Sequence, residues 1–194
     1  MSPPSPSRGI APRLEQHVGV VIGLLALWLA IIGGLVLVGL ALMTIVSVSG
    51  RAAYTNFEVL GPIRGDFELV TVGTAIAVFS FLPYAQFRRG HVAVEVATNW
   101  ASPRTKALLA MIANTLMSAA AFLIAWRLHA GLLDKFDNGE TSFILDIPAW
   151  WGYAASAVGA WSFFIVSVYT IWRSLNEWLG EGEPRHADGE AGIA

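Results

Sequence analysis

The sequence predicts an all-α integral membrane protein with four transmembrane helices, an interfacial amphipathic helix between the second and the third, and both termini in the cytoplasm. Of its 194 residues, 55% are hydrophobic and 13% are charged, whereas about a quarter of the residues in a soluble domain are charged. Four apolar runs reach the roughly 20 residues that a helix needs to cross a hydrocarbon core of about 30 Å. The distribution of Lys and Arg between the loops gives the orientation.

The first predicted span covers residues 18–49 and follows a disordered cytoplasmic tail, residues 1–17, that is rich in Pro and Ser. The span contains no Asp, Glu, Lys or Arg. Because the apolar region of a secretory signal has only about 7 to 15 residues, we expect this run to be retained as a membrane helix. Fully helical, it would be about 48 Å long and would extend beyond the hydrocarbon core. Gly19 and Gly23 have the small-xxx-small spacing that allows close helix approach, although glycine is common in membrane helices generally.

The second predicted span covers residues 67–87 and follows a polar connection with turn-forming Gly and Pro residues. Pro83 removes a backbone hydrogen bond to Phe79 and is expected to kink or loosen this helix near its cytoplasmic end. Residues 88–104 are too polar to span the membrane. As a helix they would place apolar and polar side chains on opposite faces, which suits a helix lying in the membrane plane. The alternative for this segment is a short loop.

The third predicted span covers residues 105–129 and the fourth covers residues 148–174, with a polar loop between them. Pro148 suits the first turn of the fourth helix, because the N–H that proline lacks would have had no partner there. The predicted membrane domain therefore comprises residues 18–175, and residues 176–194 form a cytoplasmic C-terminal tail. No internal repeat is visible, so the inverted-repeat organisation of many transporters is not predicted.

We expect a multi-pass protein of the bacterial inner membrane, and the positive residues in the short loops predict that both ends of the chain face the cytoplasm. With this orientation, the inner side carries Arg8, Arg13, Arg88, Arg89, Arg104, Lys106, Arg173 and Arg185. The outer side carries only Arg51, Arg64, Arg127 and Lys135. The excess of positive charge on the inner side is what the orientation rule requires.

The middles of the four spans contain no Asp, Glu, Lys, Arg or His. Ion-coupled proteins generally place ionisable groups there, so a self-contained exporter is not expected, and a haem carrier would need histidines at matching depth. Cysteine is absent, and no residues suggest a catalytic group, a metal site or a cofactor. The net charge of −2 gives no basic footprint for nucleic acid. Neutral polar residues such as Asn114 are candidate substrate contacts, although such groups more often bond a neighbouring helix.

Two separated motifs carry a family resemblance. The first is Gly61-Pro-Ile-Arg-Gly-Asp-Phe-Glu-Leu69, which continues through Leu82-Pro-Tyr-Ala-Gln86 into Arg88-Arg-Gly-His-Val-Ala-Val-Glu95. The second is Glu140-Thr-Ser-Phe-Ile-Leu-Asp-Ile-Pro-Ala-Trp150 at the entry to the last span. In these motifs and in its four spans the chain resembles the small membrane subunit of tripartite ATP-independent periplasmic (TRAP) transporters. The resemblance covers roughly residues 18–175, and Glu95 stands where the family usually has Asp.

The resemblance implies a small permease subunit without enzymatic activity. Its implied partners are a large multi-span TRAP permease subunit, which carries substrate and sodium, and a periplasmic substrate-binding protein, which delivers a small organic acid. The subunit itself is implied to act as a fixed scaffold for the large subunit. Two alternatives come from other classes: a small four-helix membrane enzyme or redox or quinone-associated subunit, and a stand-alone channel.

Eight residues are predicted to contact a partner or membrane lipids: Glu68, Arg88, Arg89, His91, Glu95, Thr141, Ser142 and Trp150. Arg88 and Arg89 would bind anionic headgroups at the inner interface. His91 and Glu95 have i, i+4 spacing, so that they could pair with each other or bond the large subunit, or simply be solvated. Glu68 is favoured by the dipole at a helix start, or contacts the partner. Thr141, Ser142 and Trp150 would shape the periplasmic surface, although Trp is also typical of an interfacial aromatic belt.

Overall fold

The structure is a computed structural model that describes residues 12–57, 61, 63–88 and 103–179. Within these residues the chain forms four helices: α1 (Pro12–Phe57), α2 (Asp66–Phe87), α4 (Pro103–Asn138) and α5 (Trp150–Leu179). Each of them has a stretch that is long and apolar enough to cross a membrane, which confirms the all-helical fold with four such helices. Most of the predicted interfacial helix, residues 89–102, lies outside the described residues.

Two helices extend furthest beyond the spans that hydropathy outlines. α1 has 46 residues, about 69 Å at 1.5 Å per residue, and it includes residues 18–49 and continues at both ends. α4 has 36 residues and continues past residue 129 to Asn138. The added residues include polar ones, and each of the two helices is longer than the thickness of a hydrocarbon core.

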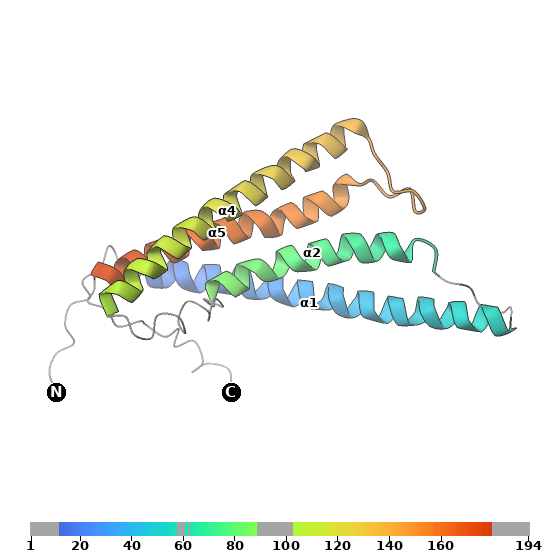
Figure 1. Cartoon of the computed structure of the whole chain (residues 1–194), viewed down its shortest axis with the longest axis horizontal. Coiled ribbons are helices and arrows are strands. Elements are labelled where there is room, and N and C mark those ends of the chain that lie inside the picture. The colour runs from blue at the N-terminus through green and yellow to red at the C-terminus, as the bar shows by residue number, and fades with distance from the viewer. Residues whose placement is uncertain (1–11, 58–60, 62, 89–102, 180–194) are drawn as a thin grey trace.

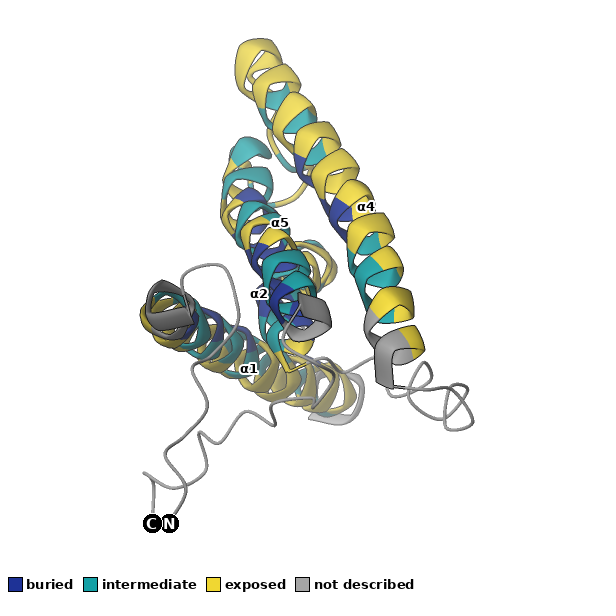
Figure 2. Ribbon diagram, turned by 90° about the vertical axis from the view of Figure 1, so that its left-hand side faces the viewer, coloured by how far each residue is buried: buried dark blue, intermediate teal, exposed yellow. Residues whose placement is uncertain are grey.

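The four helices follow the spatial order α1, α2, α5, α4 (Figures 1 and 2). α1 and α2 run antiparallel, as do α4 and α5, whereas the central pair α2 and α5 run parallel. Pro12, Phe87, Pro103 and Leu179 therefore lie at one end of the molecule, which we call the terminal end. The opposite end, where the α1–α2 and α4–α5 connections lie, is the loop end. α2 and α5 form the centre, and α4 diverges from α2 towards the loop end (Figure 1).

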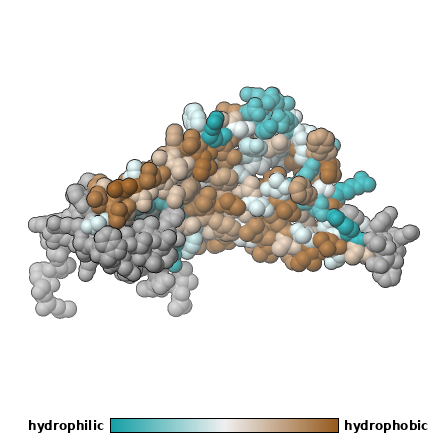
Figure 3. Space-filling view, in the orientation of Figure 1, coloured by the Kyte–Doolittle hydropathy of each residue, from teal (hydrophilic) through white to brown (hydrophobic). Residues whose placement is uncertain are grey.

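Small residues form the buried interior. Half of the apolar stretch of α5 is buried, against about a tenth for α1, and the buried residues are chiefly Ala, Ser and Gly. A lipid tail is as apolar as a Leu side chain, so helices in a membrane associate through close packing at small residues. The large apolar side chains consequently point outwards, and they give the brown surface in Figure 3.

The backbones of α5 and α2 approach each other closely at Gly159. A Cβ added at Gly159 would lie 2.5 Å from the carbonyl oxygen of Phe79. This carbonyl lacks its usual helical donor because Pro83, four residues later, has no N–H. α2 nevertheless continues past the buried Pro83 to Phe87. The proline therefore creates an acceptor that the backbone of Gly159 covers.

Gly19 and Gly23 of α1 accommodate aromatic rings from two other helices. A Cβ at Gly19 would overlap the hydroxyl of Tyr169 on α5, and a Cβ at Gly23 would lie 2.8 Å from the ring of Phe87 on α2. The two rings stack with centroids 6.1 Å apart. The two glycines, whose spacing suggested close helix approach, thus leave space for a stacked aromatic pair.

Candidate functional site

The α4–α5 loop, residues 139–149, is a compact turn at the loop end. The N–H of Ser142 donates to the carbonyl of Ile147 (2.8 Å), and the N–H of Ala149 donates to the carbonyl of Glu140 (2.8 Å). Thr141 and Pro148 form an isolated β-bridge. Pro148, expected in the first turn of the last helix, instead precedes α5 and belongs to this bridge.

Glu68, in the first turn of α2, holds this loop. Its carboxylate accepts hydrogen bonds from the N–H groups of Ile144 (2.9 Å) and Leu145 (3.2 Å). The side chain of Leu145 packs on Gly65, the residue before α2, in the place that a Cβ would occupy. Gly65 also has a φ of +73°, which residues with a Cβ seldom adopt. The glycine and the glutamate together fix the start of α2 to the α4–α5 loop.

A second contact at the loop end joins α1 to α2. The buried hydroxyl of Ser47 on α1 donates to the carboxylate of Asp66 (2.5 Å) and accepts from the N–H of Ile63 (3.3 Å). Arg51 lies 3.7 Å from the same carboxylate. Because Asp66 begins α2, its negative charge also suits the helix dipole.

A largely buried polar network joins α2, α4 and α5 near the terminal end. The side-chain amide of Gln86 donates to Asn114 Oδ1 (3.3 Å) and to Thr170 Oγ1 (3.0 Å). The amide of Asn114 donates in turn to the hydroxyl of Ser174 (2.8 Å), and Thr170 donates to the carbonyl of Ser167 (2.8 Å). Every member is neutral, so the network binds helices together without burying a charge.

Arg88 lies beside this network at the end of α2. Its N–H donates to the carbonyl of Tyr84 (3.0 Å), and its guanidinium lies 5.9 Å from the centroid of the Tyr84 ring. The side chain is exposed at the terminal end, which is compatible with the predicted contact to lipid headgroups.

The structure brings three of the eight predicted site residues together at the loop end: Glu68, Thr141 and Ser142. Trp150 is near them at the start of α5, where it packs edge-on against Phe136 (5.5 Å between centroids). Arg88 is at the opposite end of the molecule, and Arg89, His91 and Glu95 lie outside the described residues.

Sequence reasoning missed the polar network as a unit. Asn114 was considered as a substrate contact, and Gln86 only as part of a motif. In the structure, Asn114 bonds neighbouring helices, which is the more common role of a neutral polar group in a membrane helix. The available signal was that two amide side chains interrupt otherwise apolar runs, each within the terminal half of its helix.

The contacts among the described residues connect the helices to one another. Among the described residues, no group of His, Asp and Glu could hold a metal ion. The carboxylates of Glu68 and Asp66 are both at the loop end and are engaged by donors of the chain itself. The loop does present Phe143, whose side chain is fully exposed.

Comparison with known families agrees with this architecture. A model of the family described as tripartite ATP-independent periplasmic transporters, DctQ component, matches residues 40–177. The chain belongs to the DctQ family. The match spans α2, α4 and the Glu68-bound loop, together with the C-terminal part of α1 and most of α5. No curated protein and no solved structure matched the chain.

Membership of the DctQ family makes this protein the small permease subunit of a tripartite transporter. The four apolar helices and the family together indicate a multi-pass protein of the inner membrane. DctQ proteins are transporter components and not enzymes, so the alternative of a membrane enzyme is wrong. The predicted resemblance to the small membrane subunit of TRAP transporters is confirmed.

Proposed function

We propose that this DctQ subunit is a fixed scaffold that braces the large multi-span permease subunit during sodium-coupled uptake of a small organic acid delivered by a periplasmic binding protein. The single observation that supports this proposal most is the neutral middle of every span. Residues 18–49, 69–87, 107–126 and 148–172 contain no Asp, Glu, Lys, Arg or His. Coupling ions and substrate carboxylates need such groups or exposed backbone in the membrane.

The hydrogen bonds at both ends of the molecule support the scaffold role. Glu68 and Ser47 connect helices at the loop end, and Gln86 connects three helices near the terminal end. A brace must resist relative motion of its helices, and it does so best when polar contacts restrain them at two depths. Glu68 would serve this function by holding the loop, and through the loop the surface that meets a partner.

In our proposal both chain ends are cytoplasmic, which is supported by the excess of Lys and Arg on that side. The α4–α5 loop with Thr141, Ser142 and the nearby Trp150 then faces the periplasm. Arg88 would be at the cytoplasmic interface, where anionic lipid attracts it. For Arg89, His91 and Glu95 we propose contacts with lipid or with the large subunit at the same interface.

Reconstitution tests the proposal. Liposomes containing the large subunit, the binding protein and this chain should take up a labelled organic acid when a sodium gradient is applied. Omission of this chain should abolish uptake while the binding protein still binds substrate. Sodium-driven uptake by this chain alone, or full uptake without it, would contradict the scaffold role.

Co-purification provides the independent test of partnership. A tagged full-length chain extracted in mild detergent should retain the large subunit encoded beside it. A tagged Gly39→Ala chain is the control and should retain the large subunit equally well, because a Cβ at Gly39 meets nothing within 4 Å. Failure of both chains to retain a large multi-span protein would exclude a stable complex.

A further inference from the structure

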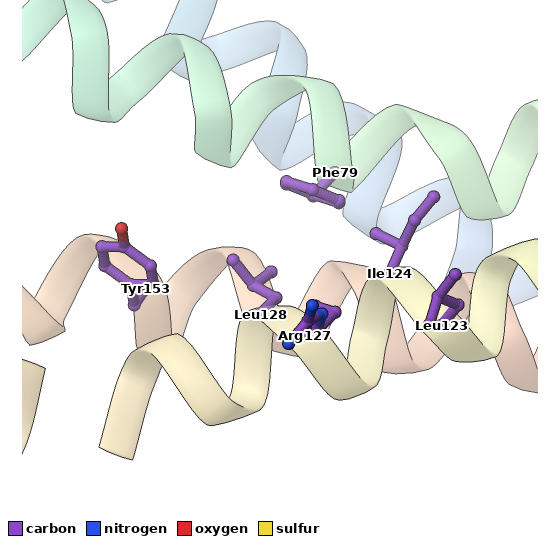
Figure 4. Close-up of a pocket in the computed structure, with 6 residues that line it drawn as sticks. All are labelled: Phe79, Leu123, Ile124, Arg127, Leu128 and Tyr153. Atoms are coloured by element: carbon purple, nitrogen blue, oxygen red, sulfur yellow. The ribbon is translucent and has the colours of Figure 1, made fainter. Parts of the chain in front are cut away.

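α2, α4 and α5 border a hollow that lies apart from the hydrogen-bonded contacts described above. It is lined by Phe79 of α2, by Leu123, Ile124, Arg127 and Leu128 of α4, and by Tyr153 of α5 (Figure 4). The hollow measures about 460 Å³ and is open on its outer side. It exists because α2 and α4 both pack on α5 and have little contact with each other, while α4 diverges towards the loop end.

The hollow runs from the edge of the hydrocarbon core into its interior. Residues 107–126 of α4 carry no charge, and at 1.5 Å per residue they are about 30 Å long, the thickness of the core. Arg127 follows immediately and therefore lies at the loop-end boundary of the core. Leu123 and Ile124 lie about one turn deeper, opposite Phe79 (Figure 4). One end of the hollow is thus cationic, and the remainder is apolar.

Arg127 has no anionic partner in the part of the chain that the structure describes. The ion pairs among those residues join Arg51 to Asp66 and Lys135 to Asp134 and Glu140. Arg127 also makes none of the described hydrogen bonds, although its side chain borders the hollow. A guanidinium next to hydrocarbon is stabilised by a hydrogen-bonded anion, and its planar donors match a phosphate with two parallel bonds.

A membrane phospholipid has both features that this hollow requires. Its phosphate lies at the boundary of the hydrocarbon core, at the depth of Arg127, and its acyl chain extends inwards along the apolar part. We propose that the hollow between α2, α4 and α5 binds one phospholipid of the loop-end leaflet, with the lipid phosphate on Arg127 and an acyl chain against Phe79, Leu123 and Ile124. The lipid would fill the gap between α2 and α4 and restrain α4.

Binding of spin-labelled lipids to the full-length chain in nanodiscs tests this site. The probes are phosphatidylglycerol, which has the phosphate and the chains, and diacylglycerol, which has only the chains. Inorganic phosphate is added as a competitor that has only the anion. We expect immobilised phosphatidylglycerol, little immobilised diacylglycerol and no displacement by inorganic phosphate.

Three variants and a control complete the experiment. Arg127→Ala should lower the affinity for phosphatidylglycerol at least about fivefold, whereas Arg127→Lys should retain most of it. Leu123→Trp, at a position that is 60% exposed, should fill the apolar part and displace the lipid without changing the charge. Arg64→Ala is the matched control, because Arg64 is an exposed cation of the loop end away from the hollow.

Equal binding by wild type, Arg127→Ala and Leu123→Trp would show that no such site exists. Displacement by inorganic phosphate would indicate an anion site without a lipid. If the lipid is absent from the complex with the large subunit and Arg127 instead cross-links to an acidic residue there, the hollow is a protein interface. Should Arg127→Ala fail to fold, Arg127→Lys and Leu123→Trp still decide the question.

Discussion

The contact between Gly159 and Phe79 predicts that one methyl group can separate the central helices. In Gly159→Ala, the new Cβ would lie 2.5 Å from the Phe79 carbonyl oxygen, 2.6 Å from its carbon and 3.0 Å from the Phe79 Cβ. Ordinary contacts of carbon atoms are about 3.5 to 4.0 Å, so α2 and α5 would have to move apart by about an ångström. The obstacle is backbone and cannot rotate away. Overpacking of this kind costs about 1–3 kcal/mol.

Unfolding in mixed micelles, with increasing sodium dodecyl sulfate and far-ultraviolet circular dichroism as readout, measures this cost. Gly159→Ala should lower the free energy of unfolding by about 1–3 kcal/mol. Gly39→Ala is the control, since its added methyl group meets nothing, and it should stay within about 0.5 kcal/mol of wild type. If the two variants are equally stable, the close approach of α2 and α5 does not exist in the protein.

Two further substitutions test the polar contacts. Gln86→Leu removes a donor from two acceptors and should lower the free energy of unfolding by about 1–2 kcal/mol in the same titration; unchanged stability would mean that the acceptors find other donors. Glu68→Ala should accelerate hydrogen exchange at the amides of Ile144 and Leu145, measured by mass spectrometry, while the amide of Ala149, which bonds within the loop, exchanges as in wild type. If the amides of Ile144 and Leu145 exchange in the variant at the same rate as in wild type, Glu68 does not hold the loop.

The number of helices and the family could be predicted from the sequence because both depend on local signals. Four uninterrupted apolar runs predict four helices of spanning length, and the motif around Glu68 predicted the family. The helix ends could not be predicted as well. α1 continues to Phe57 and α4 to Asn138 through polar residues, because a helix that leaves the membrane no longer needs an apolar surface.

The contacts between helices could not be predicted because each helix is apolar on nearly all sides. Hydropathy then gives no face that must be buried, and the spatial order depends on the positions of small and polar residues. Glu68 bonds the amide of Ile144 across 76 positions of sequence, a separation that no local pattern encodes. The sequence showed the spacing of Gly19 and Gly23, but it did not show that the rings packed on them come from two other helices.

The order α1, α2, α5, α4 divides the chain into two helical hairpins, α1 with α2 and α4 with α5, that meet mainly along the line between α2 and α5. Each hairpin can insert into the bilayer as a separate unit, because nearly all of its backbone polar groups are satisfied within its own helices. Folding would then reduce to one docking step after insertion. Since Gly159 lies on that line against Phe79, the last event of assembly depends on the residue type with no side chain at all.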